Sequence, residues 1–300
     1  MRKAEDIGIE RQNDPGLRWC PLQVQSMLAN TDEDISRNIE HSIGLDYIPF
    51  NDLLGKKSGA VAVVGSGPSL KANWQELKDF NGDIIACNAA CQFLLDKGIT
   101  PTYMFCFDAD PLTLEFFTPH KEITYLVASR CVPAAFEILK GCKIVVWHAA
   151  GDTNLQDILE KNGKMEPMVV GGSAAVTRAM ILAISMGYKE IHVYGGDSSF
   201  AAGETHIRQS TTVERRMAIK VGGRVFEVAP WMTLQINDLD KLTPLIKRCK
   251  TKMHFHGDGM LQWVAREWGF RTDYESAWAQ AVRLFVSFWT VRAKVLWLNL

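Results

Sequence analysis

The chain has 300 residues and a formal net charge of −1, from 33 Lys and Arg against 34 Asp and Glu. Hydrophobic residues make up 47% and charged residues 22%, which are ordinary globular values and exclude disorder over the whole chain. A charge balance this even gives no global electrostatic reason to wrap a nucleic acid.

The ends of the chain and its cysteines favour a cytoplasmic protein. The N-terminus has no apolar core of the kind that a secretory signal needs, and no segment reaches about 18 consecutive apolar residues. The tail Ala277–Leu300 is rich in Trp, Leu and Val but carries three basic residues, so we expect a docked amphipathic helix, with a membrane-surface or partner-binding helix as the alternative. Of the seven cysteines only Cys87 and Cys91 are close, and reduced thiols are the expected state.

From residue 59 onward, short apolar runs alternate with amphipathic segments. The predicted strands are Ala60–Val64, Ile84–Cys87, Thr102–Phe107, Ile123–Ala128, Lys143–Trp147, Met168–Val170, Ile191–Tyr194 and Lys252–His256. The predicted helices between and after them are Leu70–Phe80, Ala89–Lys97, Ala134–Leu139, Ser173–Met186 and Met260–Trp268. Continuous apolar strands alternating with helices predict a Rossmann-like α/β protein of three layers, with a mostly parallel sheet between helices.

We divide the chain into three parts on composition. Residues 1–58 are polar, with helical patches at Pro21–Ala29 and Asp32–Ile43, and form an N-terminal helical extension. Residues 59–245 form the Rossmann-like domain, although 201–245 is less regular, and residues 246–300 form a strand and helix extension.

The first candidate site is the corner Gly65-Ser66-Gly67-Pro68-Ser69 after the first strand. Two glycines allow a tight turn and close approach to a phosphate, and Pro68 suits a first helical turn. Exposed amides at a helix N-terminus favour an anion. The dinucleotide fingerprint is incomplete, because its third glycine position is Leu70. A purely structural turn is therefore the alternative.

Two further corners carry polar side chains. Asn88 follows the second strand, where its amide suits a ribose hydroxyl or a base edge, or else caps the next helix. Asp108 and Asp110 follow the third strand, where they suit Mg²⁺ or a hydroxyl, or else a simple Asp-Pro turn.

A second anion-binding corner is Gly171-Gly172-Ser173, which opens a helix. Asp197 ends the strand after that helix, and the loop that follows carries His206. Histidine titrates near neutrality, so His206 is the best candidate for a general base.

The remaining histidines are weaker candidates. His192 lies within a strand and reads as a core or interface residue. His254 and His256 alternate along another strand and point one way, but a metal site would need a third ligand, and none is close in sequence. We therefore expect no metal centre.

Taken in order, these corners resemble a known family. The glycine corner at 65–70, the Cys87-Asn88 strand end, the segment 98–103 leading to Asp108, Gly171-Gly172-Ser173, and Gly187 through Asp197 are similar to the domain family named for the archaeal 6-hydroxymethylpterin diphosphokinase, the MptE-like family. That family includes the motility accessory factors (Maf) that glycosylate flagellin, and it is distantly similar to the family-42 bacterial sialyltransferases.

The resemblance implies a nucleotide-binding transferase. It implies that Gly65–Ser69 and Gly172–Ser173 hold phosphate and that Asn88 contacts the nucleoside. The favoured activity is transfer of a sialic or nonulosonic acid type sugar from a CMP donor to a glycan, protein or other acceptor, with His206 and Asp197 in catalysis. The sialyltransferases, however, carry Asn where this chain has Ser66, and tyrosines where it has Ser199 and Phe200. Their catalytic histidine also lies further downstream than His206, so the role of His206 as a base comes from the residues and not from that resemblance.

Two alternatives stay open. One is an ATP-dependent diphosphokinase acting on a pterin, in which Asp108, Asp110 and Asp197 would hold Mg²⁺. The other is a nucleotide-binding protein that keeps the fold without the chemistry. The acceptor and the oligomeric state, including a homo-oligomer, are not fixed by the residues.

Overall fold

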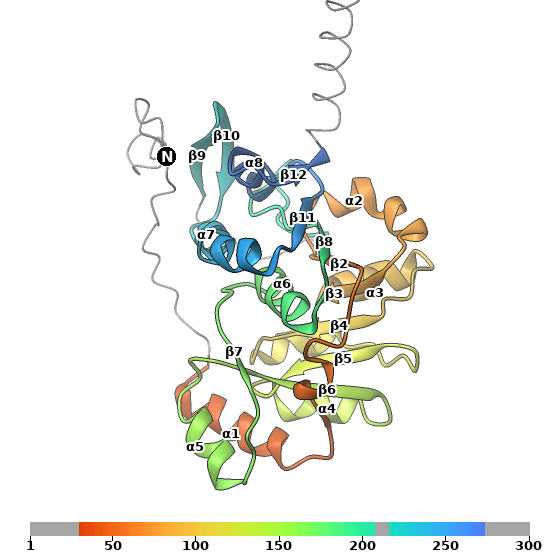
Figure 1. Ribbon diagram of the computed structural model, residues 1–300, viewed down its shortest axis with the longest axis vertical. Helices are drawn as coiled ribbons and strands as arrows, with labels where there is room; N and C mark the ends of the chain where they lie inside the picture. Colours follow the sequence, from red (N-terminus) through yellow and green to blue (C-terminus); the bar gives the residue numbers. More distant parts are fainter. Residues whose placement is uncertain (1–29, 208–215, 274–300) are drawn as a thin grey trace, which may run out of the picture.

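The computed structural model describes residues 30–207 and 216–273, coloured in Figure 1. The predicted patch at 21–29 and the tail from 277 therefore lie outside the described residues. Within them, no helix is both long enough and apolar enough to cross a membrane. Their described cysteines are all free thiols.

The centre of the molecule is one ten-stranded sheet in which every strand pair is parallel. Its path runs β1-β6-β5-β4-β3-β2-β8-β11-β12, and β7 pairs with β6. The strands are β1 (Ile48–Pro49), β2 (Ala60–Val64), β3 (Asp83–Cys87), β4 (Tyr103–Cys106), β5 (Thr124–Ala128), β6 (Lys143–Ala149), β7 (Met168–Val169), β8 (Glu190–Tyr194), β11 (Lys252–Phe255) and β12 (Arg271–Thr272).

Helices cover both faces of this sheet, with α6 and α7 on one side of the strands in Figure 1 and α2 and α3 on the other. The helices are α1 (Asp32–Ile43), α2 (Leu70–Asn73), α3 (Ala89–Asp96), α4 (Pro133–Ile138), α5 (Leu155–Lys161), α6 (Ala175–Met186), α7 (Met232–Cys249) and α8 (Met260–Glu267). Short 3-10 turns are η2 (Phe50–Leu53), η3 (Trp74–Asp79) and η4 (Pro111–Phe116), and β9 (Met217–Val221) and β10 (Arg224–Val228) form a separate hairpin. The predicted three-layer Rossmann-like fold is confirmed.

The strands bury almost all of their side chains because they are covered on both faces. Val61, Val63 and Val64 of β2 are fully buried, as are Tyr125 and Trp147 on β5 and β6. This two-sided burial explains the uninterrupted apolar runs from which the strands could be predicted.

The order of the strands reverses at the centre of the sheet. The chain moves in one direction from β2 through β3, β4 and β5 to β6, and then returns to place β8 on the other side of β2. Helices lead away from such a point on opposite faces, which leaves a crevice at the carboxyl ends of the two central strands. The Gly65 and Gly195 corners follow β2 and β8 and meet at this point.

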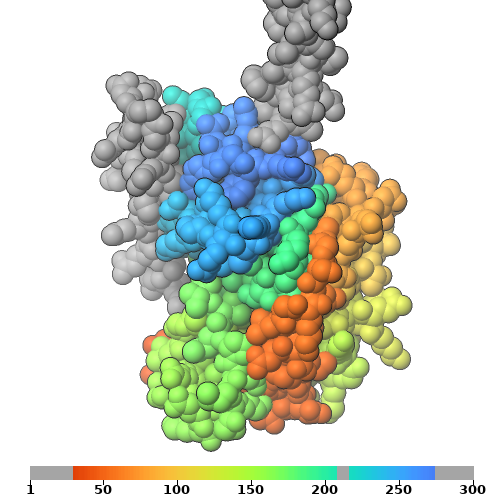
Figure 2. Space-filling view, in the orientation of Figure 1, coloured from red at the N-terminus to blue at the C-terminus, as the bar shows by residue number. Residues whose placement is uncertain are grey.

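The structure draws no boundary at either end of the predicted 59–245 domain. β1 pairs with β6 at one edge of the sheet, and β11 pairs with β8 near the other. Helix α7 runs through position 245 without a break. The segments past 245, blue in Figure 2, pack directly against the green and orange segments of the central sheet.

Candidate active site

A cavity of about 550 Å³ opens at the carboxyl ends of the central strands. It brings together residues that lie far apart in the chain, from Gly65 to Gln235. The predicted site residues that line it are Gly65, Ser66, Gly67, Asn88, Asp108, Gly172, Ser173, Asp197 and His206. The two glycine corners thus share one cavity, which the interpretation of the sequence required.

The first glycine corner is built for close contact between β2 and β8. The amide of Gly65 donates to the carbonyl of Tyr194, and that of Gly67 to the carbonyl of Gly195, each at 2.8 Å. A Cβ at Gly65 would lie 2.5 Å from the Gly195 carbonyl oxygen, and one at Gly67 would lie 2.5 Å from a carboxylate oxygen of Asp197. Both glycines are therefore required by the packing of the corner itself.

Asp197 is buried, and its side chain caps the start of the helix that follows this corner. Its carboxylate accepts a hydrogen bond from the backbone amide of Ser69 at 2.7 Å and another from the Gln262 side chain at 3.2 Å. Burial raises the pKa of Asp197, while the hydrogen bonds from Ser69 and Gln262 oppose that shift. Pro68 and Ser69 line a neighbouring cavity instead, so this helix start is closed by the chain's own carboxylate.

The second glycine corner has the same arrangement. Gly171 and Gly172 have φ of 86° and 79°, in the left-handed region that favours glycine. The amide and hydroxyl of Ser173 both donate to the carboxylate of Asp238, the latter at 2.6 Å, and Thr177 donates to the same oxygen at 2.8 Å. Asp238 comes from α7 and is only 8% exposed, so it caps α6 across the fold.

The glycine corners nevertheless leave some backbone amides without a hydrogen bond among the described residues. No hydrogen bond within the described part of the chain uses the amide of Ser66 or that of Gly172, and both residues line the cavity. These two amides could donate to an anion in the cavity, whereas those of Ser69 and Ser173 already donate to Asp197 and Asp238.

Asn88 adopts a strained backbone conformation at the end of β3, with φ 49° and ψ −123°. Its Oδ1 atom is buried and has no hydrogen-bond partner among the described residues. Strain and an unpaired polar atom are costly in a folded protein, and both are typical of residues that contact a ligand.

The predicted pair of carboxylates separates. Asp108 is exposed and lines the cavity, and one of its oxygens accepts from the amide of Asp110 at 3.1 Å. Asp110 does not line the cavity, because its side chain accepts from the amide of Leu112 at 2.9 Å and caps η4. Asp110 therefore has the role of a turn residue, which was the alternative to a functional pair with Asp108.

Two arginines supply the positive charge of the cavity, and the sequence analysis missed both. Arg178 on α6 is 7% exposed and donates to the carbonyls of Gly172 at 3.0 Å and Val169 at 2.8 Å. Arg130 follows β5 and forms an ion pair with Asp152 at 2.8 Å. Each guanidinium packs on the ring of Phe107, 4.6 Å away for Arg178 and 5.0 Å for Arg130.

Their positions carried a signal that could have been used. Arg130 stands at the end of a predicted strand, as Asn88 and Asp108 do. Arg178 falls on the first turns of a helix that opens with two glycines, where a long side chain can fold back onto the glycine corner.

His206 lines the cavity from the loop after β8. The amide of the next residue, Ile207, donates to the carbonyl of Ser66 at 2.8 Å, which ties this loop to the first glycine corner. The ring Nδ1 of His206 lies 2.9 Å from the hydroxyl of Thr205, and the ring lies nearly parallel to that of Trp231. The loop thus presents a titratable group to the same space as the glycine corners and the arginines.

The carboxylates do not fit the Mg²⁺ site that a diphosphokinase would need. Asp197 and Asp110 both serve as caps, and only Asp108 and Asp197 of the three line the cavity. In the described part of the chain, the one group of three His, Cys, Asp or Glu side chains close enough to share an ion consists of histidines and does not include these carboxylates.

Comparisons with known proteins bear on the family and the fold of the chain. A family model described as 6-hydroxymethylpterin diphosphokinase MptE-like matches residues 36–203, which is more than half of the chain. No curated protein matches. Among solved structures, the Maf glycosyltransferase from Magnetospirillum magneticum AMB-1 is similar at a TM-score of 0.61 and 15% identity, over 82% of this chain and 39% of that one. At this identity the likeness shows a shared fold.

Two sialyltransferase structures are more distant. A mammalian enzyme is 16% identical over 75% of this chain and 79% of its own, at a TM-score of 0.38. The enzyme CstII from Campylobacter jejuni is 13% identical over 66% of this chain and 79% of its own, at a TM-score of 0.31. These scores are too low to carry an argument. The chain spans well under half the length of the Maf structure.

Proposed function

The chain belongs to the 6-hydroxymethylpterin diphosphokinase MptE-like family, and from that membership we propose that it is a glycosyltransferase that uses a nucleotide-activated sugar. The favoured donor is a CMP-linked sugar of the sialic or nonulosonic acid type. The observation that carries the proposal is the single cavity that joins two glycine corners, two arginines, Asn88 and His206 at the reversal point of the sheet. A volume of about 550 Å³ lies within the range of small-molecule sites.

The donor phosphate would lie between the glycine corners and the arginines. The assigned donors are the amides of Ser66 and Gly172 and the guanidiniums of Arg130 and Arg178, since all four residues line the cavity. Arg130 is already paired with Asp152, so the cavity has little spare positive charge, which suits a single phosphate better than a triphosphate. This favours a nucleoside monophosphate as the leaving group.

The nucleoside would lie near Asn88. The Asn88 amide offers both a donor and an acceptor, and the residue lines the cavity, so it suits a ribose hydroxyl or a base edge. The ring of Phe107 lines the same part of the cavity, under the two guanidiniums.

His206 would act as the general base. In the transfer step an acceptor hydroxyl attacks the anomeric carbon of the sugar, the bond from that carbon to the phosphate oxygen breaks, and His206 accepts the hydroxyl proton. The electron pair of the broken bond leaves on the phosphate, where Arg130, Arg178 and the amides stabilise the added charge. Asp197 would act on this step only indirectly, by holding the first glycine corner.

The test is calorimetric titration of the full chain with CMP, CDP, UDP, GDP and ATP, each with and without Mg²⁺. We expect CMP to bind without Mg²⁺ and Arg178→Lys to weaken it at least tenfold, since lysine cannot reproduce two hydrogen bonds in a fixed plane. His206→Ala should keep CMP affinity and lose sugar transfer. His120→Ala, at a histidine that does not line the cavity, is the matched control and should change neither.

The outcome decides between the candidates. Tight ATP binding that requires Mg²⁺, with no CMP binding, would contradict the proposal and favour a diphosphokinase. If the chain binds CMP but shows no sugar transfer that His206→Ala abolishes, the chain is a nucleotide-binding protein and not a transferase.

A further inference from the structure

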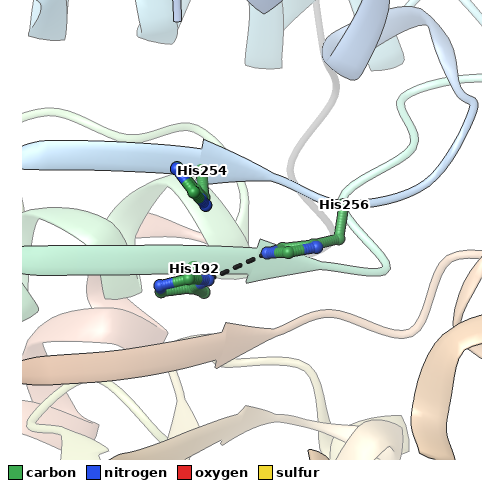
Figure 3. A group of neighbouring side chains, drawn as sticks. All are labelled: His192, His254 and His256. Atoms are coloured by element: carbon green, nitrogen blue, oxygen red, sulfur yellow. Dashed lines mark hydrogen bonds between the residues drawn. The ribbon is translucent and has the colours of Figure 1, made fainter. Parts of the chain in front are cut away.

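Three histidines gather away from the proposed active site, on neighbouring strands. His192 lies on β8, His254 on β11, and His256 directly after β11. β8 and β11 are parallel partners, and His254 is the register partner of His192. Side chains at register partners point to the same face of a sheet, and so do side chains two residues apart on a strand. The three rings therefore converge on one point, as Figure 3 shows.

We propose that His192, His254 and His256 form a binding site for a divalent transition-metal ion such as Zn²⁺. One ring nitrogen from each histidine lies within 4.8 Å of the other two. Nδ1 of His192 and Nε2 of His256 are 2.9 Å apart. Zinc binds imidazole nitrogen at about 2.0–2.1 Å, which places two tetrahedral ligands roughly 3.4 Å apart, so small ring movements would admit the ion. Three histidine ligands leave one position for water or another ligand.

Carboxylates lie beside two of the three rings, on the outside of the cluster. Nδ1 of His256, on the side away from His192, lies 2.7 Å from a carboxylate oxygen of Asp273 and 3.6 Å from one of Glu76. Nε2 of His192, again on the far side of the ring, lies 3.3 Å from Glu190. Metal-binding histidines usually direct their second nitrogen to such a carboxylate, which fixes the ring and makes the ligating nitrogen more basic.

Charged groups of both signs surround the cluster. Glu190, Glu76 and Asp273 are the acidic groups that face the cluster, and Arg271 is the basic one. A neutral imidazole is the form that binds a metal.

Arg271 opposes the ion. Its guanidinium lies 3.3 Å from Nε2 of His254, and it repels a divalent cation at the cluster. Arg271 is exposed and sits on β12, the last strand of the sheet. Removing its charge should strengthen metal binding, which a purely structural role of the histidines would not predict.

The site is separate from the proposed active site and does not depend on the proposed function. None of the three histidines lines the cavity at the glycine corners. Val193 points toward α6, since a Cβ at Gly196 would meet both Val193 and Val176. His192 therefore points to the other face of the sheet, where Phe80 packs edge-on against its ring at 5.2 Å.

The chemistry favours zinc, copper or nickel over magnesium or calcium, because imidazole nitrogen binds the former and oxygen ligands the latter. An ion here would link β8, β11 and the turn at Gly257. That turn contacts the start of α2, since a Cβ at Gly257 would lie 2.6 Å from Oγ of Ser69. The expected effect of the ion is thus a more stable central sheet.

The test uses the full chain, stripped of metal with a chelator and titrated with Zn²⁺ alone. We expect one Zn²⁺ per chain, a rise in Tm with Zn²⁺, and a change in the visible absorption of Co²⁺ that reports nitrogen ligands. His254→Gln and His256→Gln should each lower the affinity at least tenfold. His41→Gln, at an exposed histidine on α1, is the control and should leave the affinity unchanged.

Two substitutions at neighbours of the histidines keep the test decisive if the histidine variants fold poorly. Asp273→Asn should weaken Zn²⁺ about 10- to 100-fold, as loss of an outer carboxylate does. Arg271→Gln should tighten it. The proposal is overturned if His254→Gln and His41→Gln bind Zn²⁺ with equal affinity, as they would if the cysteines bound the ion. It is also overturned if neither Asp273→Asn nor Arg271→Gln changes the affinity for Zn²⁺. CMP titration of the same samples reads the proposed function separately.

Discussion

The carboxylate of Asp197 accepts a hydrogen bond from the backbone amide of Ser69, 2.7 Å away and 128 positions earlier in the chain. One partner ends the corner after β8 and the other begins the helix after β2, so this bond joins the two central corners of the sheet. It also places an acidic group, 4% exposed, where a phosphate would otherwise meet a helix N-terminus.

Asp197→Asn should change how stability depends on pH. The folded pKa of Asp197 is raised by burial, so the folded state holds its proton more tightly than the unfolded state does. Its effect on stability is therefore most favourable below the unfolded pKa of 3.8 and becomes less favourable as pH rises through the folded pKa. We expect the free energy of unfolding of wild type minus that of Asp197→Asn to fall over this window.

Urea unfolding of both proteins, from about pH 4 to about pH 7, measures this difference. Most of the other carboxylates with shifted pKa, such as Asp83 and Asp273, have lowered values and act in the opposite direction, but they cancel between the two proteins. A difference that stays constant across the range would show that Asp197 titrates normally.

Gly67→Ala should destabilise the protein and weaken nucleotide binding together. The new Cβ would lie 2.5 Å from the Asp197 carboxylate and 2.6 Å from the Gly195 carbonyl oxygen, so the corner must open. We expect a cost of about 1–3 kcal/mol in the free energy of unfolding.

Gly44→Ala is the matched control for this substitution. Gly44 ends α1 with an ordinary φ of −74°, and its nearest neighbour for a Cβ is a carbonyl oxygen at 3.4 Å. Its effect on stability should stay within about 0.5 kcal/mol. Chemical denaturation gives both values, and equal effects at the two glycines would contradict the close packing of the central corners.

Asp238→Ala should destabilise α6 at its first turn. The substitution leaves the Ser173 amide and the hydroxyls of Ser173 and Thr177 without their acceptor. Buried donors left unpaired cost about 1–3 kcal/mol, and more when the lost partner is charged. Asp240→Ala, at an exposed position on the same helix, should have little effect. Hydrogen exchange at the amides of α6 would locate the change, and protection equal to wild type would refute it.

Asn88→Gly should weaken nucleotide binding without lowering the stability of the fold. Glycine adopts φ 49° without strain, and strain of this kind costs about 1–3 kcal/mol for other residues. The greater freedom of glycine in the unfolded chain offsets about 0.5–1 kcal/mol of that. We expect a protein at least as stable as wild type in thermal unfolding that binds CMP more weakly.

Asn154→Gly serves as the comparison for Asn88. Asn154 also has a positive φ, of 61°, but does not line the cavity. Its replacement should leave CMP affinity unchanged. If both variants bind CMP as wild type does, Asn88 has no role in recognising the nucleoside.

Much of this fold could be predicted because its strands are buried on both faces and end at glycines or polar corners. The expected strand at 60–64 and the expected helix at 32–43 agree with β2 and α1 at both ends. The helix expected over 70–80 ends early, because Asn73 leaves the helical region with φ −120° and the chain continues as η3.

Helix α7 could not be recognised in the segment 201–245, which we judged irregular. Its buried face includes Gln235, Asn237 and Asp238 beside Ile236 and Leu239, so its polar residues hide the apolar period. Those polar side chains are buried because they bond across the fold, Asp238 to α6 and Gln235 to Ser198. Partners so far apart in the chain leave no local pattern.

The same reason explains what was missed and misplaced around the sites. Asp110 and Asp197 look like free carboxylates in sequence, but their backbone partners become visible only in the folded chain. His192, which we expected to be a core or interface residue, lies beside His254 and His256, because β8 carries it to them from about sixty residues away. The sequence pattern predicts where strands end, but it does not predict the register between strands such as β8 and β11.

The place of β8 has a consequence for how the chain is made. β2 and β3 can pair as soon as they leave the ribosome, but the other edge of β2 has no partner until residue 190 has been synthesised. An apolar strand edge left open for so long invites pairing with other chains. A nascent chain halted before β8 should therefore depend on a chaperone, and it still lacks both Asp197, which bonds the first glycine corner, and His206.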